Sequence, residues 1–362
     1  MRSPYLEERH EDLARRAAEA PADDLDDVRR SVQALGAAGL LDCFSGTATD
    51  VRAAAVIREA LGRRGAVLDL AFAMQGLGSG PVRIAGTPAQ QAALLPDVAA
   101  GRTVMGFALT EPEAGSDLAG VATSARADGD AWVLDGRKVF ISNAGVADAY
   151  TVLARTGEAG AKGLSMFLVR ADAPGFRVLR TFEMLSPHPI GEVSFEGCRV
   201  PHAALIGEVG QGMKIALGTL DRLRATVGAA AIGMAERALA EASAHAKART
   251  QFGKPLADQQ LVQAMIADSA TDLEAARGLV YRAAWLQDVD PAGRHTAAIS
   301  MAKLFATEAA GRVADRCVQI LGGRGVMRGE VVERVYRDVR ALRIYEGTSE
   351  IQRIVIAREV LR

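Results

Sequence analysis

Apolar positions recur at spacings of three and four residues along roughly the first hundred positions of the chain, a pattern that predicts helices. The positions that follow this spacing are Leu6, Leu13, Val28, Val32 and Leu35, and the spacing continues from Ala53 to Leu61. Segments with Gly or Pro interrupt it at Gly36, Gly39, Gly46, 78–81 and 86–88. Because Gly and Pro commonly end helices, this part of the sequence predicts a bundle of short helices.

Between Val104 and Pro201 the pattern changes to short runs rich in Val, Phe and Thr, which is typical of strands. Asp128-Gly129 and Asp135-Gly136 flank the run 131–134, and such dipeptides predict the turns of hairpins. Further strands are expected at 150–154, 164–169 and 193–195, with a turn at 173–175. This segment therefore predicts a central β domain, a barrel or a sandwich.

Helical periodicity returns after Gly212 and holds to the end of the chain. Helices are expected at 213–249, 258–287, 296–321, 330–339 and 349–361. Long helices rich in Ala and joined by short loops predict an antiparallel four-helix bundle. The fold class is accordingly α+β and multidomain, with an N-terminal α-helical domain at 1–104, a central β domain at 105–205 and a C-terminal helical bundle at 206–362.

Composition and charge narrow the class of protein. Hydrophobic residues make up 49% and charged residues 24% of the chain, which is ordinary for a globular protein. The net charge is −1, so the chain has no global positive field for nucleic acid or for an anionic membrane. The N-terminus lacks the apolar run of a signal peptide, and every Ala-rich stretch is broken by charge. We expect a cytoplasmic protein that binds neither nucleic acid nor membrane.

The three cysteines give no sign of a disulfide or a metal site. Cys43, Cys198 and Cys317 lie far apart, with no Cys or His at ligand spacing. Disulfides and a metal site are therefore not expected, and buried thiols in a reducing compartment are the simpler interpretation.

Three segments carry candidate chemistry. The first, 107–117 (FALTEPEAGSD), ends a strand in hydroxyls, carboxylates and Gly, and its free backbone N–H groups could bind a polar ligand or phosphate. The second, 138–143 (KVFISN), places an aromatic ring and a hydroxyl at the end of another strand, although such a ring is more often core. The third, 344–353 (IYEGTSEIQR), places Glu346 before a helix capped by Thr348 or Ser349. Spacing alone favours a solvated Glu346.

The three segments together resemble the acyl-CoA dehydrogenase family. The likeness runs from about Gly76 to the C-terminus and includes 221–224 (DRLR), 249–256 (RTQFGKPL) and 319–325 (QILGGRG), in the same order. The resemblance implies an α-β-α fold, tightly bound FAD, a homo-oligomer (a dimer or a tetramer) and an acyl-CoA or acyl-carrier-protein thioester as substrate. It also implies an electron-transfer flavoprotein as electron acceptor.

The resemblance also implies roles for individual residues. Thr110 would lie toward the pyrimidine end of the flavin, Phe140 beside the isoalloxazine and Ser142 at N5, while Arg249 and Gln251 would hold the FAD pyrophosphate of a neighbouring subunit. The full implied FAD site is Phe107, Leu109, Thr110, Gly115, Ser116, Phe140, Ile141, Ser142, Arg249, Gln251, Phe252, Gln260, Gln319, Gly322, Gly323, Thr348 and Glu350. The implied substrate residues are Ser116, Asp221, Leu223, Arg224, Tyr345 and Gly347.

Glu346 matches the catalytic base of the family. The implied reaction removes a proton from the carbon α to a thioester while hydride leaves the β carbon for flavin N5. A desolvated pocket would raise the pKa of the Glu346 carboxyl and make it a stronger base. Some relatives carry the base one position before the substrate Arg. Leu223 stands there in this chain, and it cannot accept a proton.

Two departures from the family pattern leave alternatives open. The segment 183–192 (EMLSPHPIGE) replaces the usual Lys-x-Gly and Arg stretch, and the region after the first helix is reduced to 42–46 (DCFSG). The alternatives are dehydrogenation of an acyl group on a carrier protein, an oxygen-using flavoenzyme on this fold, and a non-catalytic thioester-binding protein. The bulk of Leu223 in addition predicts a preference for short or compact acyl groups.

Overall fold

A computed structural model of the chain describes residues 3–21 and 27–362. Two compact units emerge, each made of segments that are not consecutive in sequence. Unit 1 comprises Met1–Glu19, Val51–Asp69 and Arg224–Arg362, and unit 2 comprises Ala20–Asp50 and Leu70–Leu223. The three consecutive domains expected from the sequence remain a proposal.

The helices are α1 Glu8–Glu19, α2 Val28–Ala37, α3 Val51–Arg64, α4 Ala66–Ala85, α5 Pro88–Ala99, α6 Gly212–Ala248, α7 Gln260–Val289, α8 Thr296–Leu321, α9 Val331–Ala341 and α10 Ser349–Val360. The strands are β1 Met105–Ala108, β2 Ser124–Asp128, β3 Ala131–Ser142, β4 Ala149–Arg155, β5 Leu164–Arg170, β6 Phe176–Thr181, β7 Ile190–Pro201, β8 Leu205–Ile206, β9 Thr250–Gln251 and β10 Lys254–Pro255. The boundary between the units falls inside α4 and α6.

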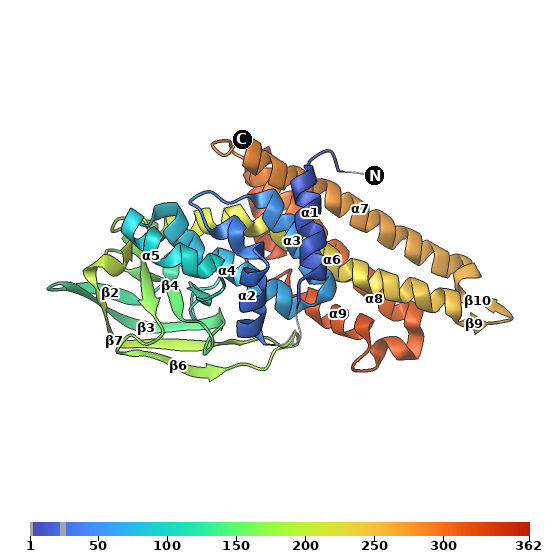
Figure 1. Ribbon diagram of the computed structural model, residues 1–362, viewed down its shortest axis with the longest axis horizontal. Coiled ribbons are helices and arrows are strands. Elements are labelled where there is room, and N and C mark those ends of the chain that lie inside the picture. The colour runs from blue at the N-terminus through green and yellow to red at the C-terminus, as the bar shows by residue number, and fades with distance from the viewer. Residues whose placement is uncertain (1–2, 22–26) are drawn as a thin grey trace. The chain divides into compact units, whose positions relative to one another are not determined.

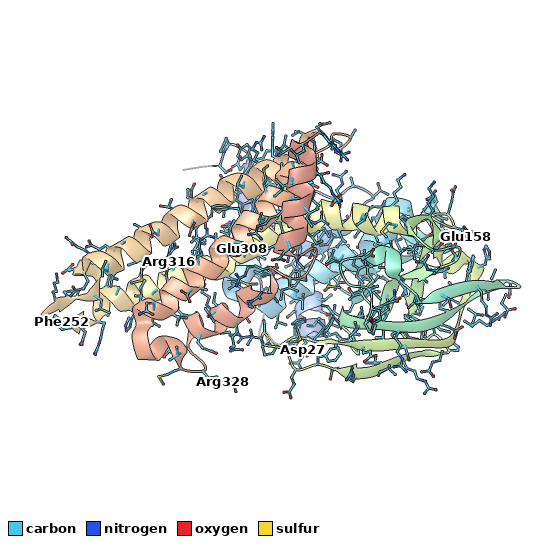
Figure 2. All side chains as sticks on the ribbon, turned by 180° about the vertical axis from the view of Figure 1, so that it is seen from behind. Asp27, Glu158, Phe252, Glu308, Arg316 and Arg328 are labelled. Carbon is cyan, nitrogen blue, oxygen red and sulfur yellow. The ribbon has the colours of Figure 1, made fainter. Side chains whose placement is uncertain are left out.

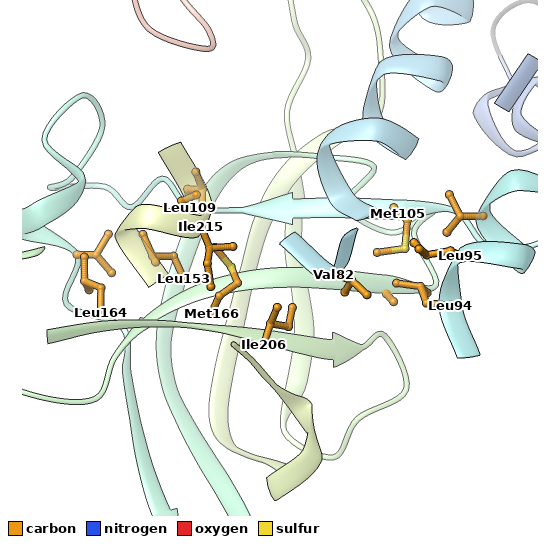
Figure 3. Packing of buried hydrophobic residues seen from close by; sticks show 14 of the residues in the cluster. Val82, Leu94, Leu95, Met105, Leu109, Leu153, Leu164, Met166, Ile206 and Ile215 are labelled. Atoms are coloured by element: carbon orange, nitrogen blue, oxygen red, sulfur yellow. The ribbon is translucent and has the colours of Figure 1, made fainter. Parts of the chain in front are cut away.

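Unit 2 is built on one eight-stranded sheet with the strand order β6-β7-β3-β2-β4-β5-β8, to which β1 adds by parallel pairing with β4. Helices α4 and α5 cover one face of this sheet (Figure 1). Figure 3 shows the core beneath them, where Val82 and Leu95 from the helices meet Met105, Leu153 and Met166 from the strands. This apolar layer holds β1 in place, so the loop that follows β1 starts from a fixed point.

Unit 1 is a helical bundle with an Ala-rich core. Residues without bulky side chains let its helices approach closely, because a Cβ on Gly228 would lie 2.7 Å from Val280 Cγ2 and one on Gly62 would lie 2.6 Å from the Ala230 carbonyl oxygen. The hairpin β9–β10 connects the ends of α6 and α7 (Figure 1). The bundle, the β domain and the helical N-terminal segment confirm the predicted fold class.

Two sequence predictions were wrong in detail. Residues 78–81 do not end a helix but lie inside α4, with Pro81 in the helix. Their glycines are required by packing, since a Cβ on Gly78 would lie 2.5 Å from Met105 Cβ. Asp135-Gly136 is not a hairpin turn but a bulge within β3, where Gly136 has φ +150° and a Cβ would lie 2.5 Å from Thr123 Oγ1. Strand β3 therefore continues to Ser142.

The sequence prediction also missed β2, β6 and the two-residue strands β8, β9 and β10. Strand β6 is exposed along its length and lies at one edge of the sheet, so it lacks the alternation of buried positions that marks a strand in sequence. Among the described residues, no helix is long and apolar enough to cross a membrane.

Candidate active site

The first two candidate segments meet in unit 2. The loop after β1 lies against the end of β3, where the Val139 N–H donates to the Thr110 carbonyl oxygen at 2.9 Å. Asn143 closes the other side, because its Nδ2 donates to the Met105 carbonyl oxygen at 2.9 Å. Thr110 and Ser142 are partly exposed there, whereas Leu109 and Ile141 are buried in the apolar core. The structure thus lays the two segments side by side at this edge of the sheet, each with a partly exposed hydroxyl.

An ion pair that sequence reasoning missed anchors this loop. The Lys138 ammonium is fully buried and donates to Glu111 Oε1 at 2.8 Å and to the Leu109 carbonyl oxygen at 2.9 Å. Glu111 also accepts from the backbone N–H groups of Ala122 and Thr123 at 2.7 and 2.9 Å. Burial disfavours the charged carboxylate, but the Lys138 charge and these hydrogen bonds outweigh it and hold the pKa of Glu111 below its usual value. Burial lowers the pKa of Lys138 to about 8.

Phe140 is the most unusual residue of this edge. It has φ +57°, a left-handed conformation that is strained for an aromatic residue, and it sits at a second irregularity in the β3–β7 register. The ring is 57% exposed and contacts Phe182, with the ring centres 5.4 Å apart. A strained backbone that exposes an aromatic ring suits the binding of a flat partner.

The open space around Gly115 also fits a large ligand. Apart from its chain neighbours, no atom lies within 4 Å of where a Cβ on Gly115 would stand, and Ser116 beside it is exposed.

The loop 186–190 lies at the same edge, because the Asn143 N–H donates to the Pro189 carbonyl oxygen at 2.8 Å. In that loop His188 Nδ1 lies 3.0 Å from the Ser186 carbonyl oxygen. Phe107, Thr110, Phe140 and Ser142 are all at least partly exposed along these two segments.

Leu223, in the part of α6 that belongs to unit 2, is only 3% exposed. It lies next to Gly76, where an added Cβ would stand 3.0 Å from Leu223 Cδ1 and 2.6 Å from Phe44 Cζ. No room is therefore left for a side chain between Gly76 and Leu223. Asp221, two positions earlier on the same helix, is partly exposed.

Unit 1 holds Glu346 in a tightly fixed turn between α9 and α10. Glu346 has φ +54° and Gly347 has φ +91°, so two consecutive residues are left-handed. Cations and an amide hold the two carbonyl groups: Arg224 Nε donates to the Glu346 carbonyl oxygen at 3.2 Å, while Lys303 Nζ and Gln352 Nε2 donate to that of Gly347 at 2.8 and 3.0 Å. Such a conformation persists only where its surroundings fix it.

The Glu346 carboxyl has an unsatisfied oxygen. Its Oε2 is buried and has no hydrogen-bond partner within the described part of the chain. Burial raises the pKa of Glu346 above its usual value, although the positive charges of Arg58, Lys303 and Arg224 act in the opposite direction. Burial likewise lowers the pKa of Lys303 to about 8. A carboxylate that loses hydration and leaves an oxygen without a hydrogen-bond partner is a stronger base than one in water.

Thr348 and Glu350 begin α10. The Thr348 hydroxyl accepts from the Ile351 N–H at 3.3 Å and caps the helix, as expected from the sequence, and Glu350 is exposed in the first turn. Tyr345, on the other side of Glu346, has its pKa raised by burial. The residues 345–348 and Arg224 thus gather around the candidate base.

The structure does not bring the hairpin residues to Glu346. Arg224 contacts the Glu346 backbone, whereas Arg249 follows the far end of α6, after roughly 35 Å of helix. Gln251 and Phe252 lie in the hairpin and Gln260 begins α7, and Figure 2 shows Phe252 at the tip. Phe252 is 96% exposed. Gln319, Gly322 and Gly323 end α8, where Gly322 has φ +60°.

Comparison with known proteins identifies the class. Three family models match consecutive parts of the chain: "Acyl-CoA dehydrogenase, N-terminal domain" at residues 5–102, "Acyl-CoA dehydrogenase, middle domain" at 106–198 and "Acyl-CoA dehydrogenase, C-terminal domain" at 210–361. The chain belongs to the acyl-CoA dehydrogenase family. It is an oxidoreductase that acts on CH–CH groups, and its cofactor is FAD.

Individual relatives agree with this. The chain is 41% identical over 306 residues to the cyclohexane-1-carbonyl-CoA dehydrogenase of Geobacter metallireducens, covering 84% of this chain and 80% of that protein. The structure matches butyryl-CoA dehydrogenase from Megasphaera elsdenii with a TM-score of 0.93 and 32% identity over the full length of both chains. A structure described as the electron transferring flavoprotein of Acidaminococcus fermentans matches with a TM-score of 0.93 and 36% identity, also over both full lengths.

Proposed function

We propose that this protein oxidises an acyl-CoA thioester to the 2,3-enoyl thioester, with Glu346 as the base that removes the α proton. The observation that carries the assignment of the base is the buried Glu346 Oε2, which has no hydrogen-bond partner in a turn that Arg224, Lys303 and Gln352 hold in place. An orphaned carboxylate oxygen is costly unless a ligand uses it. An acidic C–H of a bound thioester is such a ligand.

The chain's own groups divide the work as follows. Glu346 accepts the α proton on its carboxylate, and the left-handed turn at 346–347 fixes where that carboxylate stands. Bound FAD supplies the acceptor for the hydride that leaves the β carbon. In unit 2 we assign Phe140 to a face of the flavin ring, Thr110 and Ser142 to hydroxyl hydrogen bonds with its edge, and Gly115-Ser116 to its phosphate side.

The remaining assignments follow the family pattern residue by residue. Arg249, Gln251 and Phe252 would serve the FAD of a neighbouring subunit in a homo-oligomer, because the length of α6 separates them from Glu346 in one chain. Gln260, Gln319, Gly322, Gly323, Thr348 and Glu350 are proposed to complete that FAD site. Asp221 and Arg224 are assigned to the thioester, and an electron-transfer flavoprotein to electron uptake.

The acyl group is proposed to be short or compact. Leu223 places a full, buried side chain beside Gly76, where no room remains for a further methyl group. The names of two relatives support this proposal, since butyryl and cyclohexane-1-carbonyl are both compact acyl groups.

The test is anaerobic bleaching of the bound flavin by a panel of thioesters. The panel contains straight-chain acyl-CoA of increasing length, branched and cyclic acyl-CoA, and the same acyl groups on a carrier protein. Wild type should bleach with compact acyl-CoA, and Glu346→Gln should bleach about 100- to 10,000-fold more slowly because an amide cannot accept the proton. The matched control is Glu158→Gln, which changes an exposed glutamate of unit 2.

For each part of the proposed function, one result of this test would contradict it. Normal bleaching by Glu346→Gln would remove Glu346 from the role of base. Bleaching only by carrier-bound thioesters would replace CoA with a carrier protein, and a preference for long chains would remove Leu223 as a gauge of length. Rapid oxygen consumption without bleaching would favour an oxygen-using flavoenzyme.

A further inference from the structure

One carboxylate of α8, that of Glu308, holds both ends of the turn that carries Glu346. Glu308 Oε1 accepts a hydrogen bond from the Ser349 hydroxyl at 2.6 Å. Its other oxygen, Oε2, accepts from Arg343 Nη1 at 3.2 Å. Arg343 stands three positions before Glu346 and Ser349 three positions after it, and Figure 2 shows Glu308 on α8. The side chain of Glu308 thus joins the residue that enters the turn to the residue that leaves it.

The backbone of the turn is closed at the same place. The Ser349 N–H donates to the Arg343 carbonyl oxygen at 3.0 Å, so the two ends of the turn are also hydrogen-bonded to each other. Between them, Lys303 Nζ of α8 donates to the Gly347 carbonyl oxygen at 2.8 Å. Helix α8 therefore holds the turn at its two ends through Glu308 and at its centre through Lys303.

The contacts of Glu308 are those of a charged carboxylate. Burial raises the pKa of Glu308, but the hydrogen bonds from Ser349 and Arg343 outweigh it and hold the pKa below its usual value. Hydrogen bonds to an ionised carboxylate are roughly twice as strong as those between neutral groups. Ser349 is buried, so its hydroxyl has little water to turn to if Glu308 is removed.

The turn needs such support because its backbone is strained. Glu346 has φ +54°, in the left-handed region that a non-glycine residue avoids. A residue keeps this conformation only where its surroundings fix it. A return to negative φ would change the direction of the Glu346 side chain, since the direction of a side chain follows the backbone. Contacts that fix both ends of the turn oppose this change.

We propose that Glu308 is a positioning residue for the base: by holding Arg343 and Ser349 together, it keeps the Glu346 carboxylate where it meets the α proton. This inference rests on the proposed role of Glu346. Displacement of a reacting group by about 1 Å can cost about 100-fold in rate. Loss of Glu308 should therefore slow proton removal and leave binding of the thioester largely unchanged.

The test isolates proton removal from hydride transfer. The probe is a short acyl-CoA with sulfur in place of the β carbon and deuterium on the α carbon, which has no β hydride to give. Its α C–D bond breaks, the electron pair stays on the thioester as an enolate, and the deuteron passes to the Glu346 carboxylate. A proton from solvent then takes its place on the α carbon. Mass spectrometry follows this exchange on the FAD-loaded enzyme, with the probe alone as the blank.

The expected result is a loss of exchange without a loss of binding. Glu308→Ala should exchange the deuterium about 10- to 100-fold more slowly than wild type, while the Kd of the probe changes less than about threefold. Glu308→Gln keeps an oxygen that can accept from the Ser349 hydroxyl and should restore much of the lost rate. If Glu308→Ala fails to fold, Ser349→Ala removes one of the two contacts and should slow exchange about three- to tenfold.

The matched control is Asp272 of α7, which also accepts from two partners. Arg312 Nη2 and Arg316 Nη1 of α8 each donate to it at 2.8 Å. Its side chain is 17% exposed, against 26% for Glu308, and within the described chain it makes no hydrogen bond to the turn at 343–349. Asp272→Ala should lower stability as Glu308→Ala does, yet exchange deuterium at the wild-type rate.

The failure of this inference differs from the failure of the proposed function. Wild-type exchange in Glu308→Ala, or equal slowing in Glu308→Ala and Asp272→Ala, would overturn the positioning role. In either case Glu346→Gln would still be without exchange, and the proposed function would stand. Exchange at the wild-type rate in Glu346→Gln would overturn the role of Glu346 itself.

Discussion

Two glutamates, one in each unit, have carboxyl pKa values that are shifted in opposite directions. Glu111 of unit 2 accepts hydrogen bonds from Lys138 and from two backbone N–H groups, and its pKa is lowered. Glu346 of unit 1 leaves a buried oxygen without a partner, and its pKa is raised. Both lie in loops that match family motifs, so their sequence contexts do not separate them.

The difference lies in how many hydrogen bonds each carboxylate makes. A carboxylate that accepts several hydrogen bonds is stabilised as an anion and is a weaker base, so it supports structure. An unsaturated one makes the folded state less stable and is available for chemistry. Glu111 thus fixes the loop that we assign to the flavin, and Glu346 is left free to act.

The largest expected contrast is in stability. Glu111→Gln should lower the free energy of unfolding by about 3–5 kcal/mol, because it leaves the fully buried Lys138 without its counter-ion. Glu346→Gln should leave it unchanged or raise it, since it removes a buried charge that lacks hydrogen bonds. Denaturant unfolding of both variants measures the contrast, and equal losses would show that the two carboxylates play the same part.

The pH dependence of stability should separate the same two residues. The lowered pKa of Glu111 contributes stability that is present above the pKa of an unfolded glutamate and is lost as pH falls through its folded pKa. The raised pKa of Glu346 contributes stability that is present below the unfolded pKa and is lost as pH rises toward its folded pKa.

Relative to wild type, the deficit of Glu111→Gln should therefore fade on acidification. The gain of Glu346→Gln should grow as pH rises, by up to about 1.4 kcal/mol for each unit by which the pKa is shifted. Melting temperatures across a pH series give both differences. Parallel curves for wild type and Glu346→Gln would mean that this carboxyl titrates as it does in the unfolded chain.

A smaller effect on FAD retention tests whether the exposed Phe140 ring of unit 2 contacts a ligand. Phe140→Leu should weaken FAD retention about three- to tenfold, because it removes the exposed ring that we assign to the flavin face. Unfolding of the apoprotein should change little, as is usual for exposed positions. FAD release is followed by fluorescence, with Tyr336→Leu, an exposed aromatic of α9, as the control. Equal FAD retention in the two variants would make Phe140 a surface residue.

Much of the fold could be predicted from local pattern. The expected helix 296–321 coincides with α8, and the expected starts and ends of α6 and α10 lie within a residue of those observed. The errors arose where tertiary packing overrode local chemistry. Gly78 and Gly80 look like breakers in sequence, yet in α4 they make room for Met105 and Thr219. Gly136 looks like a turn, yet it forms a bulge against Thr123.

Only part of the candidate site could be predicted from the sequence. Glu346 was singled out by resemblance, because an acid in front of a helix cap has no distinctive spacing. Two buried cations of unit 1 were missed, since Arg58 and Lys303 are charged positions on helix faces that turn out to be buried. A charge at the apolar spacing of a helix is the signal that would have pointed to them. Their partners, Asp69 and the Gly347 carbonyl, come together only in the folded chain.

The glycines of α4 have a consequence for how this sequence can vary. Any replacement at Gly78 or Gly80 adds at least a methyl group, and at both positions even that atom would overlap a neighbour in unit 2, Met105 or Thr219. Alanine, which stabilises most helices, is therefore excluded at two glycine positions where helix propensity favours it. Mutational tolerance in this helix is set by its neighbours, so a library that scored each position by propensity alone would rank its worst substitutions among its best.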